Sequence, residues 1–377
     1  MQAKTAMAFL HHASPGQVVS IRVVHVASGR EWRGGQRQVW FTARALGTVP
    51  DIDQVVVTSR GSGLQRRLEE ASVPVLTPRW TIGLDPRALW AIASECRQSD
   101  ILHAHDSHAV ILAGLAARLR GCQFVATRRT AFPLSRPGFW NRADRVIAIS
   151  EAVGQMLRES GVRADRIRVI RSGINLDAIL MLQPIDPRTM LGLGPDTLIA
   201  IAVGALDRHK GQDIVIQAAA EARARLPNLH WILAGEGERR AALESQVQRL
   251  GLGENVHLLG HITDAEALIG GADVMVATPI QEGLGTSILD AMALGVPVVA
   301  AEIGGIPELV GGGAGLLVPP QSPVDVANAV VRILTQRDEC QAMVRLAAER
   351  VTDFTDTRMA EALASVYRSM QKEVGGP

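Results

Sequence analysis

An acidic residue ahead of a glycine-rich helix start is the feature of this chain best suited to chemistry. Glu282 stands directly before Gly283, Leu284, Gly285 and Thr286, and the side chain of Thr286 or Ser287 is expected to cap the helix that follows. Free backbone amides and the positive end of the helix dipole attract phosphate oxygens at such a position. Asp290 lies about two helical turns beyond Glu282, on the same face. The segment predicts a diphosphate pocket flanked by two carboxylates; an ordinary solvated turn is the alternative.

A lysine in an arginine-rich chain is the second such feature. The sequence contains three lysines against 36 arginines, and Lys210 directly precedes Gly211 and a predicted helix. A compact ammonium at the start of a helix would neutralise a diphosphate leaving group, and Arg208 is expected to reach the same phosphates. The alternative is a surface lysine without a function.

A glycine pair after the first predicted strand offers a third candidate site. Gly34 and Gly35 resemble a glycine loop whose backbone amides approach phosphates, while Arg33, Gln36 and Arg37 could line the side of a second substrate. A glycine pair at a strand-to-helix turn is also compatible with a purely structural role.

Three histidines cluster near the end of another predicted strand, in the segment ILHAHDSHAV. His103, His105 and His108 either satisfy backbone groups or face a substrate, and Asp106 or Ser107 is expected to cap the next helix. No acidic or cysteine partner follows at metal-ligand spacing, so we expect no metal site here.

The first half of the chain is basic and the second half is acidic. Residues 1–180 contain 24 Lys and Arg against 14 Asp and Glu, whereas residues 181–377 contain 15 against 24. Seven arginines, Arg128 and Arg129 among them, are interleaved with aromatic residues over 118–145. This segment is either a solvated basic face or a patch for an anionic acceptor or membrane surface. Nucleic acid is not expected as a partner, because aromatic residues make up only 3% and no nucleic-acid-binding motif is present.

Short β-branched runs alternate with helical patterns, which predicts parallel sheets covered by helices on both faces. The runs are residues 18–28, 53–59, 100–105, 122–127, 145–150 and 167–173, and then 197–204, 229–235, 255–260, 272–278, 296–301 and 315–320. The proline-containing stretch 174–195 between the two sets is expected to be a linker. We therefore predict an α/β fold of two doubly wound, Rossmann-like domains that face a central cleft.

The domain limits follow from this pattern. An N-terminal extension is expected over 1–17, the two domains over 18–178 and 190–352, and a final helix within 353–377. Three scattered cysteines favour a reduced, cytoplasmic protein, and no apolar run reaches the length of about 20 residues that a membrane span needs. Peripheral contact with the inner face of an anionic membrane, through the basic domain, remains compatible with this composition.

The segment from Glu282 to Asp290 resembles the E-x7-E region of GT-B glycosyltransferases of family 4, with aspartate in place of the second glutamate. The resemblance implies a retaining, metal-independent transferase without a cofactor, whose donor is a nucleotide sugar, a UDP- or GDP-sugar above all. Its acceptor would be a lipid-linked or cell-envelope glycan bound to the basic domain. The final helix would cross back to the first domain.

Site roles follow from the same resemblance. Glu282 would hold sugar hydroxyls, Asp290 the ribose, Lys210 the diphosphate, and His105 would face the transferred sugar. Gly235 and Glu236 would lie beside the nucleotide, and the backbone of Leu259, His261 and Ile262 would contact the base. Ala205 stands where the family usually has an arginine. Two alternatives therefore stay open, namely a non-hydrolysing nucleotide-sugar epimerase and a non-catalytic protein that binds sugar nucleotides.

Overall fold

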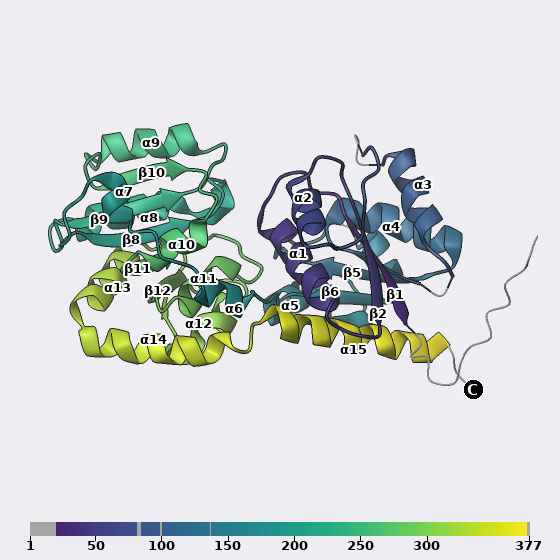
Figure 1. The fold of residues 1–377 in the computed structure, drawn as a ribbon. Coiled ribbons are helices and arrows are strands. Elements are labelled where there is room, and N and C mark those ends of the chain that lie inside the picture. The colour runs from purple at the N-terminus through teal and green to yellow at the C-terminus, as the bar shows by residue number, and fades with distance from the viewer. Residues whose placement is uncertain (1–19, 81–83, 99, 136, 375–377) are drawn as a thin grey trace, which may run out of the picture.

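The β-branched runs form two parallel sheets in the computed structural model, which describes residues 20–80, 84–98, 100–135 and 137–374 (Figure 1). The first sheet has the order β3-β2-β1-β4-β5-β6-β7. Its strands are β1 (Ile21–Ala27), β2 (Ile52–Thr58), β3 (Val75–Leu76), β4 (Ile101–Ala104), β5 (Gln123–Arg128), β6 (Arg145–Ala148) and β7 (Ile167–Val169). The predicted extension over 1–17 lies outside the described residues.

The second sheet has the order β10-β9-β8-β11-β12-β13. Its strands are β8 (Leu198–Val203), β9 (Leu229–Ala234), β10 (Val256–Gly260), β11 (Val274–Ala277), β12 (Val298–Ala301) and β13 (Leu316–Val318). In both sheets the strand order reverses beside the first strand, between β1 and β4 and between β8 and β11. The predicted pair of doubly wound domains is confirmed, and only the two-residue edge strand β3 had no counterpart among the predicted runs.

Helices cover both faces of each sheet. Those of the first domain are α1 (Gly34–Leu46), α2 (Gly63–Glu70), α3 (Pro86–Glu95), α4 (Ser107–Arg120) and α5 (Glu151–Glu159), with the short 3-10 helices η1 (Gly138–Arg142) and η2 (Ala164–Arg166). The remaining ones are α6 (Leu176–Leu180), α7 (Pro187–Leu191), η3 (Arg208–Lys210), α8 (Gln212–Ala222), α9 (Arg240–Arg249), α10 (Ala265–Gly270), α11 (Thr286–Ala293), α12 (Ile306–Val310), η4 (Gly311–Gly313), α13 (Pro323–Thr335), α14 (Arg337–Val351) and α15 (Asp356–Val374).

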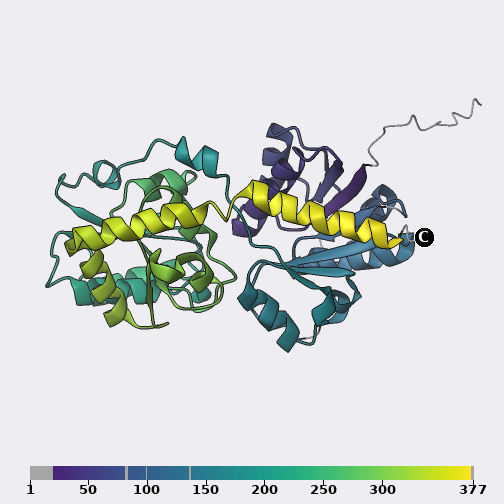
Figure 2. The same ribbon diagram turned by 90° about the horizontal axis from the view of Figure 1, so that it is seen from below.

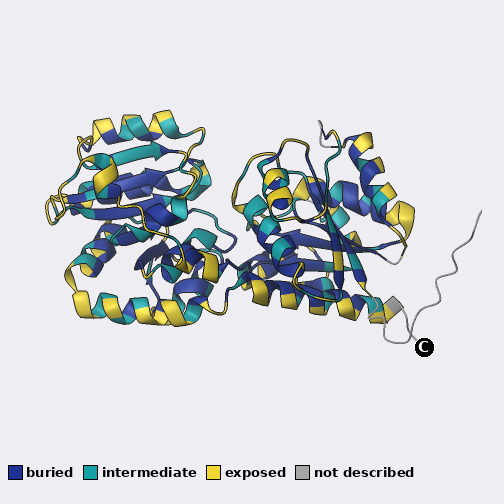
Figure 3. Cartoon of the chain, in the orientation of Figure 1, coloured by how far each residue is buried: buried dark blue, intermediate teal, exposed yellow. Residues whose placement is uncertain are grey.

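The central strands are buried on both faces, as parallel sheets between helices require (Figure 3). Strands β4 and β12 have no exposed residue. Polar side chains therefore gather at the carboxyl ends of the strands, where the loops of the two domains meet. Within the described ranges, no helix has the length and apolar character needed to cross a bilayer.

The chain passes between the domains twice, and the two passages lie side by side. Ile174 donates from its amide to the carbonyl of Phe354 at 2.9 Å and accepts from the amide of Asp356 at 2.8 Å. Gly173 is required here because a Cβ at that position would collide with the carbonyl of Thr355. Figure 2 shows α14 and α15 running end to end across the boundary.

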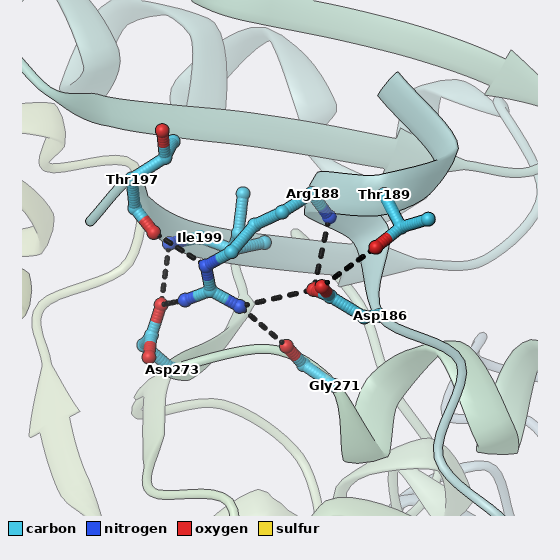
Figure 4. A network of polar contacts seen from close by, with 7 residues as sticks. All are labelled: Asp186, Arg188, Thr189, Thr197, Ile199, Gly271 and Asp273. Carbon is cyan, nitrogen blue, oxygen red and sulfur yellow. Dashed lines mark hydrogen bonds and ion pairs between the residues drawn. The ribbon is translucent and has the colours of Figure 1, made fainter. Parts of the chain in front are cut away.

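The segment 174–195 is not the open linker that its prolines suggested. It contains α6 and α7, and Arg188 of α7 fixes it to the second domain (Figure 4). The Arg188 guanidinium pairs with Asp273 and donates to the carbonyls of Thr197 at 2.6 Å and Gly271 at 3.1 Å. The crossing itself is therefore only a few residues long, close to Ile174.

Helix α15 packs on the first domain against α1 and completes its core. Tyr367 and Met370 of α15 are fully buried there. On the helix surface, Arg368 forms a two-point ion pair with Asp51 at 2.6 Å for both bonds. The first domain thus contains residues from both ends of the described chain.

Candidate active site

The second domain carries a pocket at the place where its strand order reverses. The Nζ of Lys210 lies 2.6 Å from Oε2 of Glu282 there, between the carboxyl ends of β8 and β11. Gly285 and Ser287 of the following loop and helix line the same pocket. Ligands of open α/β sheets bind at such a switch point, so the structure brings the two strongest candidates of the sequence together.

The position of Lys210 is fixed by the loop between β8 and α8. Gly211 has φ = +67°, and a Cβ there would collide with the carbonyl of Thr278. The Thr278 hydroxyl donates to the carbonyl of Gly211 at 2.8 Å, and the Gln212 side chain donates to the carbonyl of Ala205 at 2.7 Å. These contacts hold the loop against the end of β11, so that the ammonium of Lys210 lies beside Glu282. Arg208, in contrast, is exposed and has no polar partner within the described ranges.

Helix α11 begins with free amides. Gly285, at φ = +92°, is its N-cap residue and no side chain caps it, so the predicted caps Thr286 and Ser287 are wrong. Both residues instead form the first turn of the helix. Leu284 is buried beneath the loop, and the carbonyl of Glu282 lies so close to Gly304 that a Cβ there would collide with it. The uncapped helix start leaves donors and a positive dipole end beside Lys210, which suits a diphosphate.

The loops after β8, β9 and β10 are in close contact. A Cβ at Gly235 would collide with the carbonyl of Gly204, and the amide of Gly235 donates to Gly260 at 2.8 Å. Glu236 is half exposed and accepts from Arg240 at 2.7 Å. His261 is exposed, while Leu259 and Ile262 are partly buried beside it. The predicted nucleotide residues thus lie on neighbouring loops at the carboxyl edge of the sheet.

Asp290 is buried and already has a partner. Arg37 of α1 in the first domain donates to both of its carboxylate oxygens, at 2.7 and 3.0 Å, and also lies 3.0 Å from Glu266. Arg37 was predicted to face an acceptor, and Asp290 a ribose. In this conformation the two side chains bind each other across the domain boundary.

The start of α1 faces the second domain. Arg33 lies 3.3 Å from Asp207, which belongs to the loop before Lys210. Gly34 and Gly35 have open space around them, and no side chain caps the helix. The Gln36 side chain folds over Gly29. Within the described part of the chain, the amides of Gly34 and Gly35 therefore have no partner, and they directly follow Arg33, which contacts the second domain.

The histidines occupy the switch point of the first domain. His25 Nδ1 lies 2.9 Å from His105 Nε2, and His103 contacts the Tyr367 hydroxyl at 2.6 Å and Thr127 Oγ1 at 2.7 Å. His108 is exposed, and Asp106 caps α4 as expected. The ring nitrogens of His25, His103 and His105 lie close enough together to ligate a cation, which sequence spacing did not suggest because His25 lies on a different strand.

The positive charge of Arg129 disfavours a cation at this histidine cluster, although its rings are neutral. Burial, together with the positive charge of Arg129, lowers the pKa of His25 to about 3, and the pKa values of His103 and His105 are lowered by the same causes and by neighbouring rings. A terminal nitrogen of Arg129 lies 3.1 Å from His105 Nδ1. A metal ion would have to displace these contacts beside a guanidinium, so the cluster fits a neutral hydrogen-bonded group.

Arg128 and Arg129 point into the first domain rather than outward. Arg128 donates to Ser107 Oγ at 3.0 Å and to the carbonyl of Phe132 at 2.6 Å, and its guanidinium lies over the Trp140 ring. These two residues therefore do not belong to the solvated basic face that was one of the two interpretations of this segment. Tyr367 and His25, which contact His103 and His105, carry no motif in the sequence and were missed.

Comparisons with known proteins agree with this geometry. The model of glycosyl transferases group 1 matches residues 188–350, and the model of glycosyltransferase family 4 matches residues 32–178. Together the two matches cover most of both domains. The chain belongs to glycosyltransferase family 4.

Relatives of this glycosyltransferase come from several bacteria. It is 26% identical over 294 residues to EpsD of Bacillus subtilis (strain 168), a protein named as a glycosyltransferase. The matched region covers 71% of this chain and 76% of EpsD. It is 31% identical over 246 residues to a D-inositol 3-phosphate glycosyltransferase of Nocardia farcinica, which covers 62% of this chain. The matched part spans 54% of that Nocardia protein, about half of its length.

Solved structures share the fold. Anabaena HepE, crystallised in complex with UDP-glucose, matches 93% of this chain and 100% of its own with a TM-score of 0.83 at 23% identity. A glycosyltransferase of Rickettsia africae matches with a TM-score of 0.80 at 18% identity. The predicted GT-B architecture is therefore confirmed for this glycosyltransferase.

Proposed function

We propose that this glycosyltransferase moves a sugar, with retention of configuration, from a UDP- or GDP-sugar to a lipid-linked or cell-envelope glycan. The use of a sugar-nucleotide donor is supported by the Lys210–Glu282 pair beside the uncapped start of α11. A cation, a set of free amides and a carboxylate converge there on one pocket, and these are the groups that a sugar diphosphate needs.

The ion pair gives each residue a role in transfer. Without donor, Lys210 and Glu282 neutralise each other. When a diphosphate enters, the ammonium binds its oxygens, which releases Glu282 to accept hydrogen bonds from sugar hydroxyls. The bond from the anomeric carbon to the phosphate oxygen breaks as the acceptor oxygen bonds to that carbon on the same face, and the departing phosphate accepts the acceptor proton. The protein orients the reactants and stabilises the leaving charge, without a metal.

Donor and stereochemistry are testable together. UDP, GDP and ADP would be screened by thermal shift, because a ligand of the folded state raises the apparent stability. The matching sugar nucleotides would then be supplied with glycan acceptors and with an inositol phosphate, the acceptor class in the name of the Nocardia relative. Retention is expected in the anomeric signals of the product. An inverted product, or an epimerised donor formed without acceptor, would overturn the proposal.

Membrane contact is the second part of the proposal. Trp90 of α3 is 73% exposed, and Arg87 of the same helix and Arg118 of the neighbouring α4 are exposed as well. An exposed indole among arginines suits the interface of an anionic bilayer. Sedimentation with phosphatidylglycerol vesicles is expected to carry down the protein at low salt, and Trp90→Ala to reduce this. Binding that is equal for neutral vesicles and insensitive to salt would contradict it.

A further inference from the structure

Arg129 is an inward-pointing cation without an anionic partner. Among the residues that the structure describes, its buried Nε has no hydrogen-bond acceptor, and a terminal nitrogen lies 3.1 Å from the neutral ring of His105. No carboxylate of the described chain forms an ion pair with it, whereas Arg37, Arg188 and Arg368 each have one. Arg129 is partly buried and still reachable from outside, and its guanidinium has no ion-pair partner, so it is suited to receive a charge from outside the described chain.

The negative charge that acts on Arg129 is the carboxylate of Asp106, which raises the pKa of the guanidinium without forming an ion pair with it. Burial keeps His25, His103 and His105 neutral and raises the pKa of the Tyr367 hydroxyl, which leaves it protonated. The nearby Asp106 is occupied, since it accepts from Ser28 and from the first amides of α4. Desolvation also lowers the pKa of Arg129 to about 10, a value at which it still carries its charge near neutral pH.

A cavity adjoins this guanidinium and holds a second unsatisfied group. Arg129, His105, Thr127 and Ser172 line it, together with Thr42 of α1 and the apolar side chains of Met359 and Leu363 of α15. Ser172 is fully buried and its hydroxyl has no partner within the described chain. A charged donor and a hydroxyl donor thus face one cavity from the ends of β5 and β7, and the Nε of Arg129 and the Oγ of Ser172 have no partner among the described residues.

The cavity lies next to the donor loop of the other domain. A Cβ at Gly283 would collide with the carbonyl of Arg129 and would lie 3.1 Å from Ile149, which also lines the cavity. Ser150 donates to the carbonyl of Gly283 at 2.7 Å. Gly283 directly follows Glu282, the residue assigned to the transferred sugar, so the cavity is within reach of the substrates where they meet.

We propose that this cavity binds the carboxylate or phosphate group of a sugar substrate, with Arg129 and Ser172 as its donors. The inference rests on the proposed transfer reaction and narrows its substrate class to acidic sugars. The anionic group comes either from the donor, as the carboxylate of a hexuronic acid, or from the acceptor. In both cases the substrate brings the anion that forms an ion pair with Arg129.

The anion site is tested first without any nucleotide. Unfolding temperatures of the full chain would be measured in sodium phosphate and in sodium chloride at equal ionic strength, for the wild type, Arg129→Met and Ser172→Ala. Arg163→Met, which removes an exposed arginine, is the control for the general stabilising effect of phosphate. We expect phosphate to stabilise the wild type and Arg163→Met equally and Arg129→Met less. An equal phosphate effect in wild type and Arg129→Met would overturn the site.

Substrate panels then identify the source of the charge. Binding of UDP-glucuronic acid and UDP-glucose, or of the corresponding GDP-sugars, is compared in wild type and Arg129→Met. A preference for the acid of about tenfold or more, lost in Arg129→Met, assigns the group to the donor, since hydrogen bonds to charged groups contribute on this scale. If neutral donors suffice, acceptor glycosides with and without a carboxylate or phosphate are compared in the same way.

Failure of this inference differs from failure of the proposed reaction. If neutral and acidic substrates bind and react alike in wild type and Arg129→Met, the acidic substrate class is wrong and the transferase stands. If no sugar nucleotide binds while the Arg129-dependent phosphate effect persists, the anion site stands and the proposed reaction is wrong.

Discussion

Lys210 and Glu282 lie 72 residues apart in the sequence, yet their Nζ and Oε2 atoms are 2.6 Å apart at the pocket of the second domain. The pair is formed before any ligand arrives, because both residues follow strands that are neighbours in the sheet. Binding a diphosphate therefore exchanges one partner of the ammonium for another instead of ordering a free side chain.

Lys210→Ala is expected to lower kcat/KM by about 10²- to 10³-fold, the usual scale for removing one electrostatic contact to a developing charge. It also leaves Glu282 without its cation. Steady-state kinetics with the donor found by thermal shift measures the effect, and Lys372→Ala, at an exposed lysine of α15, is the matched control. Wild-type kinetics in Lys210→Ala would remove this residue from the mechanism.

Arg37→Met is expected to destabilise the folded protein by roughly 3–5 kcal/mol, because it leaves the buried carboxylate of Asp290 unpaired. The double variant Arg37→Met/Asp290→Asn removes the charge as well and should recover a large part of that loss. Urea unfolding of both single variants and the double variant gives the coupling between them. Losses that simply add would show that the two side chains do not depend on each other.

Stability is expected to fall as the pH drops below about 6.5, where unfolded histidines begin to bind protons. The folded pKa of His25 is lowered to about 3, so the folded state takes up its proton only at that much lower pH. At pH 5 the difference for His25 alone is about 2 kcal/mol of unfolding free energy. The contributions of His103 and His105 have the same sign.

Urea unfolding of the wild type at pH 7.5, 6 and 5 measures this slope. His25→Gln removes one titrating group and should make the slope shallower, whereas His108→Gln changes an exposed histidine of α4 and should leave it as it is. Equal unfolding free energies at all three pH values would contradict the neutral, buried state of the cluster.

Gly173→Ala is expected to destabilise the folded chain by about 1–3 kcal/mol, the usual range when an added methyl group overfills a packed site. The new Cβ would collide with the carbonyl of Thr355 where the two crossings pair. Gly194→Ala is the matched control, since a Cβ there meets nothing within 4 Å. If both variants unfold alike, the two crossings are not held together as tightly as the contacts indicate.

The strands were predictable because apolar β-branched runs and the turns between them are local features of the sequence. The proximity of Lys210 to Glu282 followed as well, since the carboxyl ends of parallel strands share one edge. The pairing of Arg37 with Asp290 did not, because an ion pair between domains leaves no spacing in the sequence. The caps proposed for α11 failed for a local reason: Gly285 adopts a left-handed conformation that places Thr286 and Ser287 inside the helix.

The return of α15 to the first domain has a consequence for synthesis on the ribosome. Residues 20–172 leave the exit tunnel well before Tyr367 and Met370, whose buried side chains close one apolar flank of that domain. Until translation has passed the whole second domain, this flank lacks its cover and leaves apolar side chains exposed. Production of the intact protein is therefore expected to depend on chaperones that shield the unfinished half.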